Sequence, residues 1–282
     1  MDILGDLNMK IITHDNGWTK IIDEDINSLT NEQIIEVIRL VVSNMVVVFK
    51  NQSMTPEQEV NFCKVAGAVQ YYPESEKRIK DIAVGNHILR VTGEKNKNGE
   101  EGLFGHVSAL DWHANQCSNK NRDPLIWLYG VKGTKGSRTS WLNMIEAYND
   151  LPEDIKNQIK EYKIFCGYKD GKYSTSKFFH NHVNKENLFD LVMENKEGKT
   201  GLYFPFLQTF GIYNIDEKRY NLIWELLYDH VLNDKYIYHH DWDDGDIVIS
   251  EQWLSVHKRW EFDGMGNRLL HRIAFNYDNI YG

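Results

Sequence analysis

The chain has 282 residues, of which 41% are hydrophobic and 12% aromatic, and it carries a formal net charge of −9. This composition is typical of a globular protein with a sizeable core and unlike that of a disordered chain. The acidic balance gives no support to a nucleic-acid partner. No apolar run approaches the roughly 18 residues of a membrane-spanning helix, and the first residues lack a secretory signal pattern, so we expect a cytoplasmic protein with no membrane partner.

The chain contains three cysteines, an odd number without C-x-x-C spacing: Cys63, Cys117 and Cys166. This pattern argues against a disulfide framework and against a structural zinc site. Cys117 lies four residues after His113 and could line a site formed there, but a plain buried thiol is the simpler interpretation.

The first predicted elements have clear boundary signals. Residues 10–23 predict a short strand followed by a turn. Thr30 and Gln33 form a capping box, which opens a helix whose apolar residues recur at helical spacing. The apolar run at 45–49 is typical of a strand that is buried on both faces. A second helix is predicted over 55–67, with threonine at the N-cap, proline at the first position and glycine at its end.

The rest of the chain alternates short strands with two further helices. The helices are predicted over 152–165 and 216–231, whereas residues 167–187 have no clear period and are interpreted as a lid or an insertion. The predicted strands are 82–84, 88–91, 200–204, 236–238, 246–250 and 268–275. Many short strands without βαβ alternation favour an α+β fold around an antiparallel sandwich or barrel. Nothing divides the chain, so we predict one domain over residues 1–282.

The first candidate site is a histidine followed two positions later by an oxygen-bearing side chain. His113 follows Trp112, which reads as buried, and precedes Asn115 by two positions. Positions i and i+2 of an extended segment face the same side, so both side chains can converge on one ion. A third ligand must come from elsewhere in the chain, and the best candidate is His257.

Two arginines on the predicted last strand form the second candidate site. Arg268 and Arg272 are four residues apart, so they face the same side of a strand. The planar guanidinium group binds carboxylates bidentately, and a fixed pair of them predicts anionic ligands. The structural alternative is that Arg272 pairs with an acid such as Glu251 or Asp246.

Several short motifs occur in a fixed order along the chain: Val46-Val47-Val48-Phe49-Lys50-Asn51-Gln52, Thr55-Pro56-Glu57-Gln58, Gly67, Trp112-His113, the turn from Gly136 to Trp141, Gly201-Leu202-Tyr203, Gly245-Asp246, His257 and the two arginines. In this order the chain resembles the taurine dioxygenase-like family of iron(II)- and 2-oxoglutarate-dependent oxygenases, from about residue 20 to residue 276. The resemblance implies a double-stranded β-helix core, jelly-roll or cupin-like, with flanking helices.

The resemblance also implies a role for each candidate residue. It assigns His113 and His257 to the metal. It assigns Thr139 and Arg268 to the outer carboxylate of 2-oxoglutarate. Arg272 falls where family members with anionic substrates bind the acidic group of the substrate.

Asn115 departs from the family pattern, which has an aspartate at this position. An amide oxygen can ligate a metal but carries no charge, so it binds iron more weakly than a carboxylate does. Three interpretations stay open. In the first, Asn115 ligates the metal as a neutral donor and the enzyme still hydroxylates. In the second, Asp111 or a water completes the coordination shell of the metal. In the third, the site has a different function. A changed site would be a halogenase, although chloride-binding relatives have a smaller residue here, or a non-catalytic binding protein.

Other histidines and aromatic residues are weaker candidates. His180 and His182 fall in the irregular region and are interpreted as surface or lid residues. His239 and His240 face opposite sides if their segment is a strand, which argues against joint ligation. The tryptophans near the candidate site are core aromatics that can also wall the pocket, and one of them is assigned to substrate binding: Trp112.

We therefore predict an Fe(II)- and 2-oxoglutarate-dependent dioxygenase that uses O2 and releases succinate and CO2. Its substrate is predicted to be a small molecule, anionic or amino-acid-like, and hydroxylation is the simplest outcome. Pocket loops determine which substrate binds, and their structure is the hardest part of this chain to predict from the sequence. The oligomeric state is left open, although a homo-oligomer is in keeping with the family.

Overall fold

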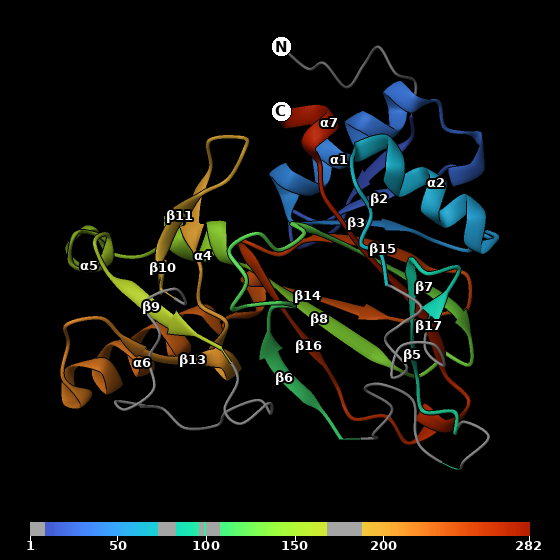
Figure 1. The fold of residues 1–282 in the computed structure, drawn as a ribbon. Helices are drawn as coiled ribbons and strands as arrows, with labels where there is room; N and C mark the ends of the chain where they lie inside the picture. Colours follow the sequence, from blue (N-terminus) through green and yellow to red (C-terminus); the bar gives the residue numbers. More distant parts are fainter. Residues whose placement is uncertain (1–8, 73–82, 96–98, 100–107, 168–187) are drawn as a thin grey trace.

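Two facing β-sheets form the centre of the molecule (Figure 1). The computed structural model describes residues 9–72, 83–95, 99, 108–167 and 188–282. The large sheet has eight strands, in the spatial order β1 (Ile11–Thr13), β2 (Lys20–Ile22), β3 (Val46–Phe49), β15 (Ile247–Glu251), β7 (Leu125–Lys132), β17 (Leu269–Phe275), β5 (Ile88–Thr92) and β4 (Ala83–Val84). The small sheet has four, in the order β14 (Ile237–Asp241), β8 (Arg138–Asn143), β16 (Ser255–Arg259) and β6 (Leu110–His113).

The inner faces of the two sheets pack against each other through apolar side chains. Val48, Ile126 and Val248 of the large sheet belong to one buried cluster with Trp141 and Tyr238 of the small sheet. Side chains alternate between the faces of a strand, so the same strands also supply a second set of apolar residues to the outer face. The central strands of the large sheet are therefore buried on both sides, as the apolar run at 45–49 predicts.

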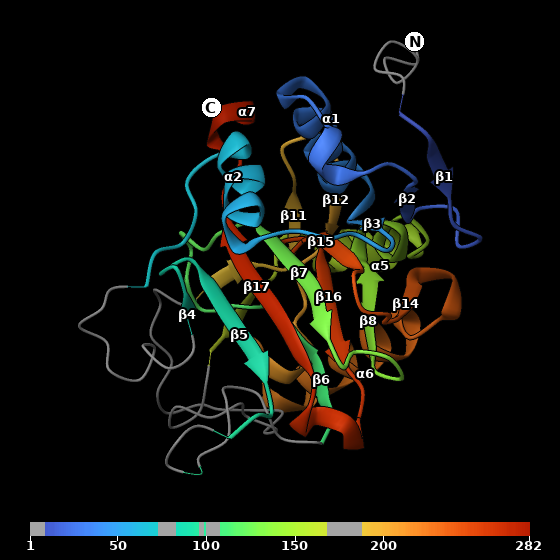
Figure 2. The ribbon, with the colours of Figure 1, turned by 90° about the vertical axis from the view of Figure 1, so that its right-hand side faces the viewer.

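Two helices cover the outer face of the large sheet, α1 (Asn31–Asn44) and α2 (Pro56–Ala66) (Figure 2). Both begin with capping boxes, in which Thr30 and Thr55 accept hydrogen bonds from the backbone N–H three residues later; the box at Thr30 and the N-cap at Thr55 were predicted. The short C-terminal helix α7 (Asp278–Tyr281) lies beside α2. The N-caps Thr30 and Thr55 satisfy backbone N–H groups that have no hydrogen-bond acceptor within the first turn of a helix.

A second layer packs on the outer face of the small sheet. It consists of α4 (Met144–Asn149), α5 (Glu153–Ile159), α6 (Glu217–Val231), a three-stranded sheet β10 (Leu188–Asp190), β9 (Lys163–Cys166) and β13 (Thr209–Ile212), and the pair β11 (Val192–Glu194) and β12 (Thr200–Leu202). Their buried side chains share one cluster with Trp112, Leu142 and Val256 of the small sheet. The small sheet is therefore held between the large sheet and this layer.

One predicted helix is wrong in its second half. The helix expected over 152–165 ends at Ile159, and Lys163–Cys166 forms strand β9 between β10 and β13. The apolar run Ile164, Phe165 and Cys166 is compatible with a helix or a strand by its periodicity. Its pairing with β10 and β13 makes it a strand. The predicted helix at 216–231 is confirmed as α6, with Asp216 as its N-cap.

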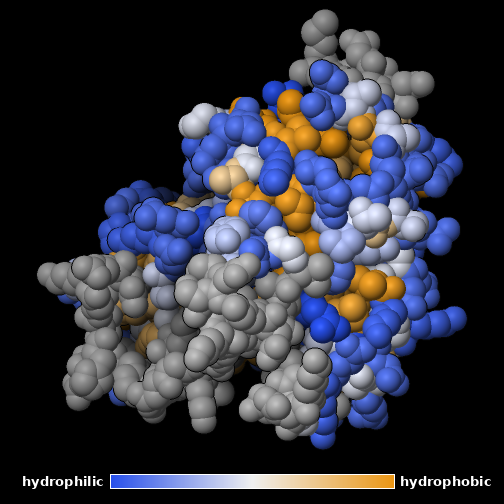
Figure 3. Space-filling view, turned by 45° about the vertical axis from the view of Figure 1, so that its right-hand side comes forward, coloured by the Kyte–Doolittle hydropathy of each residue, from blue (hydrophilic) through white to orange (hydrophobic). Residues whose placement is uncertain are grey.

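The surface and the cysteines agree with the composition. On the face shown in Figure 3, hydrophilic side chains predominate and apolar ones gather in a band that descends from the top of the view. No helix in the described part of the chain is both long and apolar enough to cross a membrane. All three cysteines are buried and free in this structure, and Cys117 packs in the core rather than in the candidate site.

Candidate active site

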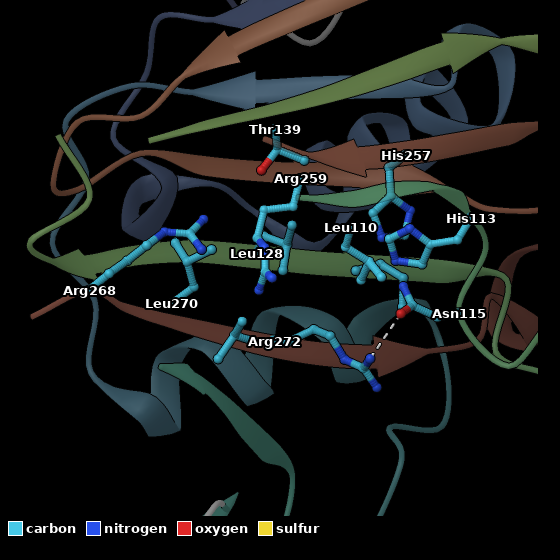
Figure 4. A pocket seen from close by; sticks show the side chains of 12 residues that line it. Leu110, His113, Asn115, Leu128, Thr139, His257, Arg259, Arg268, Leu270 and Arg272 are labelled. Atoms are coloured by element: carbon cyan, nitrogen blue, oxygen red, sulfur yellow. Dashed lines mark hydrogen bonds between the residues drawn. The ribbon is translucent and has the colours of Figure 1, made fainter. Parts of the chain in front are cut away.

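A cavity opens between the inner faces of the two sheets and brings together all of the predicted site residues except Trp112 (Figure 4). Its volume is about 520 Å³, including the part open to solvent. The large sheet and the residue before its strand β17 contribute Val91, Ile126, Leu128, Arg268, Leu270 and Arg272. The small sheet and the turn after β6 contribute Leu110, His113, Asn115, Thr139, His257 and Arg259. Among the described residues, the lining contains three arginines and no carboxylate.

His113 and His257 face each other across neighbouring strands. They are Cα partners in the β6–β16 ladder, and their ring centroids are 4.1 Å apart. On its other side the ring of His257 stacks on Trp141, with the centroids 6.5 Å apart. Two residues far apart in the sequence thus present imidazole rings to the same end of the cavity, as a shared metal would require.

The environment keeps both imidazoles neutral. Nδ1 of His113 lies 2.7 Å from the backbone oxygen of Asp111. A carbonyl oxygen only accepts, so Nδ1 carries the hydrogen and Nε2 carries the lone pair, the form in which imidazole binds a metal. Burial lowers the pKa of His113 to about 4, and the charges of Arg259 and Arg272 act in the same direction. Burial, followed by the charges of His113 and Arg272, lowers the pKa of His257 well below its ordinary value.

Asn115 lies beyond the end of β6, in a turn, with its side chain in the cavity. Its Oδ1 accepts a hydrogen bond from Nη1 of Arg272 across 3.0 Å (Figure 4). Its Nδ2 is buried without a hydrogen-bond partner among the described residues. The strand that was expected to carry both His113 and Asn115 therefore stops at His113, although both side chains do face the same cavity.

Arg268 lies at the opposite end of the cavity from the histidines (Figure 4). Its side chain is only 1% exposed, and its Nε has no partner among the described residues. Its Nη1 donates to the sulfur of Met265 at 3.7 Å, and a thioether is a weak acceptor. Burial, together with the charge of Arg259, lowers the pKa of Arg268 to about 9. A buried guanidinium with so weak an acceptor is suited to an anionic ligand.

Thr139 faces this end of the cavity from β8. Its Oγ1 accepts a hydrogen bond from Nε1 of Trp242 at 3.0 Å, which fixes the hydroxyl and turns its own hydrogen toward another acceptor. The approach of the chain just before Arg268 depends on Gly133, whose φ is +62°. A Cβ there would lie 2.3 Å from the backbone oxygen of Asn267. Glycine at this turn therefore allows Arg268 to enter the cavity.

One cavity residue, Arg259, was not predicted from the sequence. It lies on β16 two residues after His257, and its register partner on β8 is Thr139. Because side chains at i and i+2 share a face of a strand, the histidine itself was a signal that Arg259 faces the cavity. Next to Lys258 and Trp260, however, it resembles one member of a solvated surface stretch.

Two proposed contributors lie outside the cavity. Trp112 faces the opposite side of β6 from His113 and packs, 3% exposed, in the cluster behind the small sheet. This placement argues against a substrate-binding role for Trp112. The carboxylate of Asp111 is about half exposed and pairs with Lys258 at 3.1 Å, so it does not replace Asn115 as a ligand.

The remaining candidates also separate. His239 is exposed and His240 is buried beside Asp246, which confirms that they face opposite sides of β14. Arg272 donates to Asn115 and to the hydroxyl of Tyr72, rather than pairing with an acid as the structural alternative supposed. Glu251 instead accepts from the backbone N–H groups of the turn after β15. His180 and His182 lie outside the described residues.

The donor set fits an iron–oxoacid pair with one substitution. Within the described residues, no three His, Cys, Asp or Glu side chains come together as a metal site, since the third position is an amide. Two neutral imidazoles and an amide oxygen remain as donors, a combination that Fe(II) accepts at lower affinity than two imidazoles and a carboxylate. Arg268 and Thr139 at the far end have the chemistry to hold a carboxylate.

Comparison with known proteins identifies the class. The sequence model described as "Taurine catabolism dioxygenase TauD, TfdA family" matches residues 15–274, so the chain belongs to this family. It is 25% identical over 213 residues to pentalenolactone F synthase of Streptomyces avermitilis, with 69% of this chain and 70% of that protein covered. It is 23% identical over 248 residues to the alpha-ketoglutarate-dependent 2,4-dichlorophenoxyacetate dioxygenase of Burkholderia sp. strain RASC, with 81% of this chain and 80% of that protein covered.

A solved structure agrees with the fold. The crystal structure of AAD-2 in complex with Mn(II) and N-oxalylglycine matches with a TM-score of 0.75 at 18% identity, with 95% of this chain and 96% of that chain covered. These comparisons confirm three predictions: the family, the double-stranded β-helix core with flanking helices, and the enzyme class of 2-oxoglutarate-dependent dioxygenases.

Proposed function

We propose that this chain binds Fe(II) and 2-oxoglutarate in the cavity between its sheets and hydroxylates a small molecule with O2. The observation that carries the proposal is the pairing of His113 with His257 in one cavity with the buried Arg268. Bound Fe(II), 2-oxoglutarate and O2 supply the oxidising power for a C–H bond, with succinate and CO2 as products.

The residues of the chain have distinct roles in this proposal. His113 and His257 hold the metal as neutral imidazoles, and Asn115 offers an amide oxygen as the third donor. Arg268 and Thr139 hold the outer carboxylate of the oxoacid and so fix its distance from the metal. Apolar walls, among them Leu128 and Leu270, exclude water from the reacting centre.

We further propose that the primary substrate carries an acidic group that binds Arg272. This guanidinium lies at the metal end of the cavity, and its Nε has no partner among the described residues. The substrate in the name of one relative, 2,4-dichlorophenoxyacetate, is a carboxylate, which agrees with this assignment. An amino acid would also fit, because it carries a carboxylate.

The test is an anaerobic titration of the metal-free protein with Fe(II) and 2-oxoglutarate, following the weak visible charge-transfer band of the chelate. We expect a band in the parent protein, none in His257→Ala, and an unchanged band in the control His239→Ala, whose side chain is exposed on β14. Absence of the band in both the parent and Asn115→Asp would overturn the oxygenase proposal in favour of a binding protein. Metal-dependent succinate release distinguishes an enzyme from a binding protein, and chloride incorporation would reveal a halogenase.

We also propose that residues 1–282 form one domain. The small sheet supports this, because one of its faces lines the cavity and the other lies in the core of the α4–α6 layer. Limited proteolysis that released a stable, separately folded α4–α6 fragment would contradict a single domain.

A further inference from the structure

The cavity contains one more cation than the proposed roles require. Arg268 and Thr139 account for the outer carboxylate, and Arg272 lies beside Asn115 at the metal end. Arg259 projects from β16 into the space between them (Figure 4). Arg259 therefore lines the same cavity as Arg268 and His113.

The backbone places Arg259 with the residues of the outer-carboxylate end. Arg259 and Thr139 are Cα partners in the β16–β8 ladder, so their side chains leave the sheet side by side. Arg259 is 7% exposed, and one of its N–H groups donates to the backbone oxygen of Ser108 at 2.9 Å. That bond anchors the side chain at the cavity wall, and a guanidinium is a planar fork of five N–H donors whose geometry matches a carboxylate.

The chemistry of the cluster favours a carboxylate between the two guanidinium groups. Arg259 and Arg268 repel each other in a buried site, and an anion between them removes that repulsion. A carboxylate has about four acceptor positions, enough for the Thr139 hydroxyl, a bidentate Arg268 and one donor from Arg259.

We propose that Arg259 is a cosubstrate-binding residue, which together with Arg268 forms a two-guanidinium clamp on the outer carboxylate of the oxoacid. This inference rests on the proposed function, because it assumes that the oxoacid spans the cavity from Arg268 to the metal. It adds a determinant of selectivity: the clamp favours oxoacids with a second carboxylate over those that lack one.

The experiment measures binding by calorimetry in the presence of Mn(II), which binds the ligand without turnover. The ligands are 2-oxoglutarate and pyruvate, a 2-oxoacid without an outer carboxylate. The variants are Arg259→Gln, Arg268→Gln, the double variant and Arg259→Lys. The matched control is Arg219→Gln, which removes an exposed arginine from α6.

We expect Arg259→Gln to weaken 2-oxoglutarate binding by about 10- to 100-fold, the range of a charge-assisted hydrogen bond, and pyruvate binding by less than about 3-fold. The effects of Arg259→Gln and Arg268→Gln should be less than additive in the double variant, because both groups bind one carboxylate. Arg259→Lys keeps the charge but not the fork and should fall between the parent and Arg259→Gln. The control should bind like the parent.

Three results would overturn the clamp. The first is unchanged 2-oxoglutarate affinity in both Arg259 variants. The second is an equal loss for 2-oxoglutarate and pyruvate, which would make Arg259 a structural residue. The third is a loss confined to an acidic primary substrate, which would move Arg259 to the substrate side. A parent protein that binds Mn(II) but neither oxoacid would instead refute the proposed function, and the clamp with it.

Discussion

Arg272 donates a hydrogen bond from Nη1 to Oδ1 of Asn115 across 3.0 Å. Oδ1 is the atom that an amide offers to a metal, so the guanidinium competes for its electron density and places a positive charge beside the proposed metal position. The oxygen has a second lone pair, and the two interactions can coexist. If Asn115 ligates the metal as proposed, we expect it to be a weaker ligand than an unbonded amide, and weaker still than the carboxylate of the family pattern.

Replacing Asn115 by aspartate should strengthen metal binding. A carboxylate brings the missing negative charge, and its second oxygen can keep the bond from Arg272. Mutation of a residue that only hydrogen-bonds a metal ligand typically changes metal affinity by about 10- to 100-fold. A change of the ligand itself should have at least this effect, so we expect Mn(II) affinity to rise by at least ~10- to 100-fold. Titration followed by electron paramagnetic resonance measures this. Asn119→Asp, which adds the same charge at an exposed position outside the cavity, is the control, and equal gains in both variants would remove Asn115 from the ligand set.

Replacing Arg272 by glutamine should also strengthen metal binding, but less. The variant removes a cation next to the imidazole pair and releases Oδ1 of Asn115. We expect Mn(II) affinity to rise by a few-fold to about 10-fold, with a gain that shrinks at high salt. Arg268→Gln provides the comparison, because Arg268 lies at the other end of the cavity and should change oxoacid binding rather than metal binding. A fall in metal affinity in Arg272→Gln would show that Arg272 orients Asn115 for ligation.

Glu251 should make the stability of the protein depend on pH. Its side chain is 1% exposed, and burial raises the pKa of its carboxyl to about 7 from an ordinary value of 4.5. The folded protein therefore keeps a proton that the unfolded chain releases in this range, and the free energy of unfolding falls as pH rises from 4.5 to 7. The full loss is about 3 kcal/mol.

Urea denaturation at pH 5 and pH 8 measures this loss. Glu251→Gln should flatten the difference between the two pH values relative to the parent, even though the amide replaces one of the two acceptors for the Trp253 and Leu254 N–H groups. Glu261→Gln, at an exposed position, should keep the slope of the parent. A slope that survives in Glu251→Gln would assign the pH dependence to other groups.

How far the sequence predicts this site depends on the distance over which residues cooperate. The capping boxes at Thr30 and Thr55 were predictable because both partners lie within one helical turn. The pairing of His113 with His257 depends on a ladder between distant strands, and only the order of motifs along the chain indicated it. Residue types alone would have ranked His239 and His240 as highly.

Other features needed the packed structure. The bond between Arg272 and Asn115 joins the last strand to a turn after β6, and no local pattern predicts it. Arg259 was predictable in principle from its spacing to His257, but its burial follows from the sheet that covers it. The strand Lys163–Cys166 was mistaken for a helix because a short apolar run has no period of its own.

Glu59, which lies between α2 and the large sheet, should be a main determinant of the stability of the protein. Its carboxylate is fully buried between α2 and the large sheet, where Oε1 lies 2.7 Å from Nδ1 of His271 and Oε2 accepts from Nε1 of Trp127 at 3.1 Å. Glu59→Ala leaves both partners without this acceptor in a buried position. We expect a loss of about 3–5 kcal/mol in the free energy of unfolding, because breaking a buried polar pair costs more than the pair contributes.

The matched control is Glu57→Ala, which removes the same side chain from an exposed position of the same helix and should cost less than about 1 kcal/mol. Glu59→Gln keeps one acceptor and should fall between the parent and Glu59→Ala. His271 directly precedes Arg272 on β17, so loss of its hydrogen bond to Glu59 should also loosen the Arg272–Asn115 hydrogen bond. The substitution Arg272→Gln should then change Mn(II) affinity less in Glu59→Ala than in the parent protein. Equal, small losses in Glu59→Ala and Glu57→Ala would show that the network relaxes without Glu59.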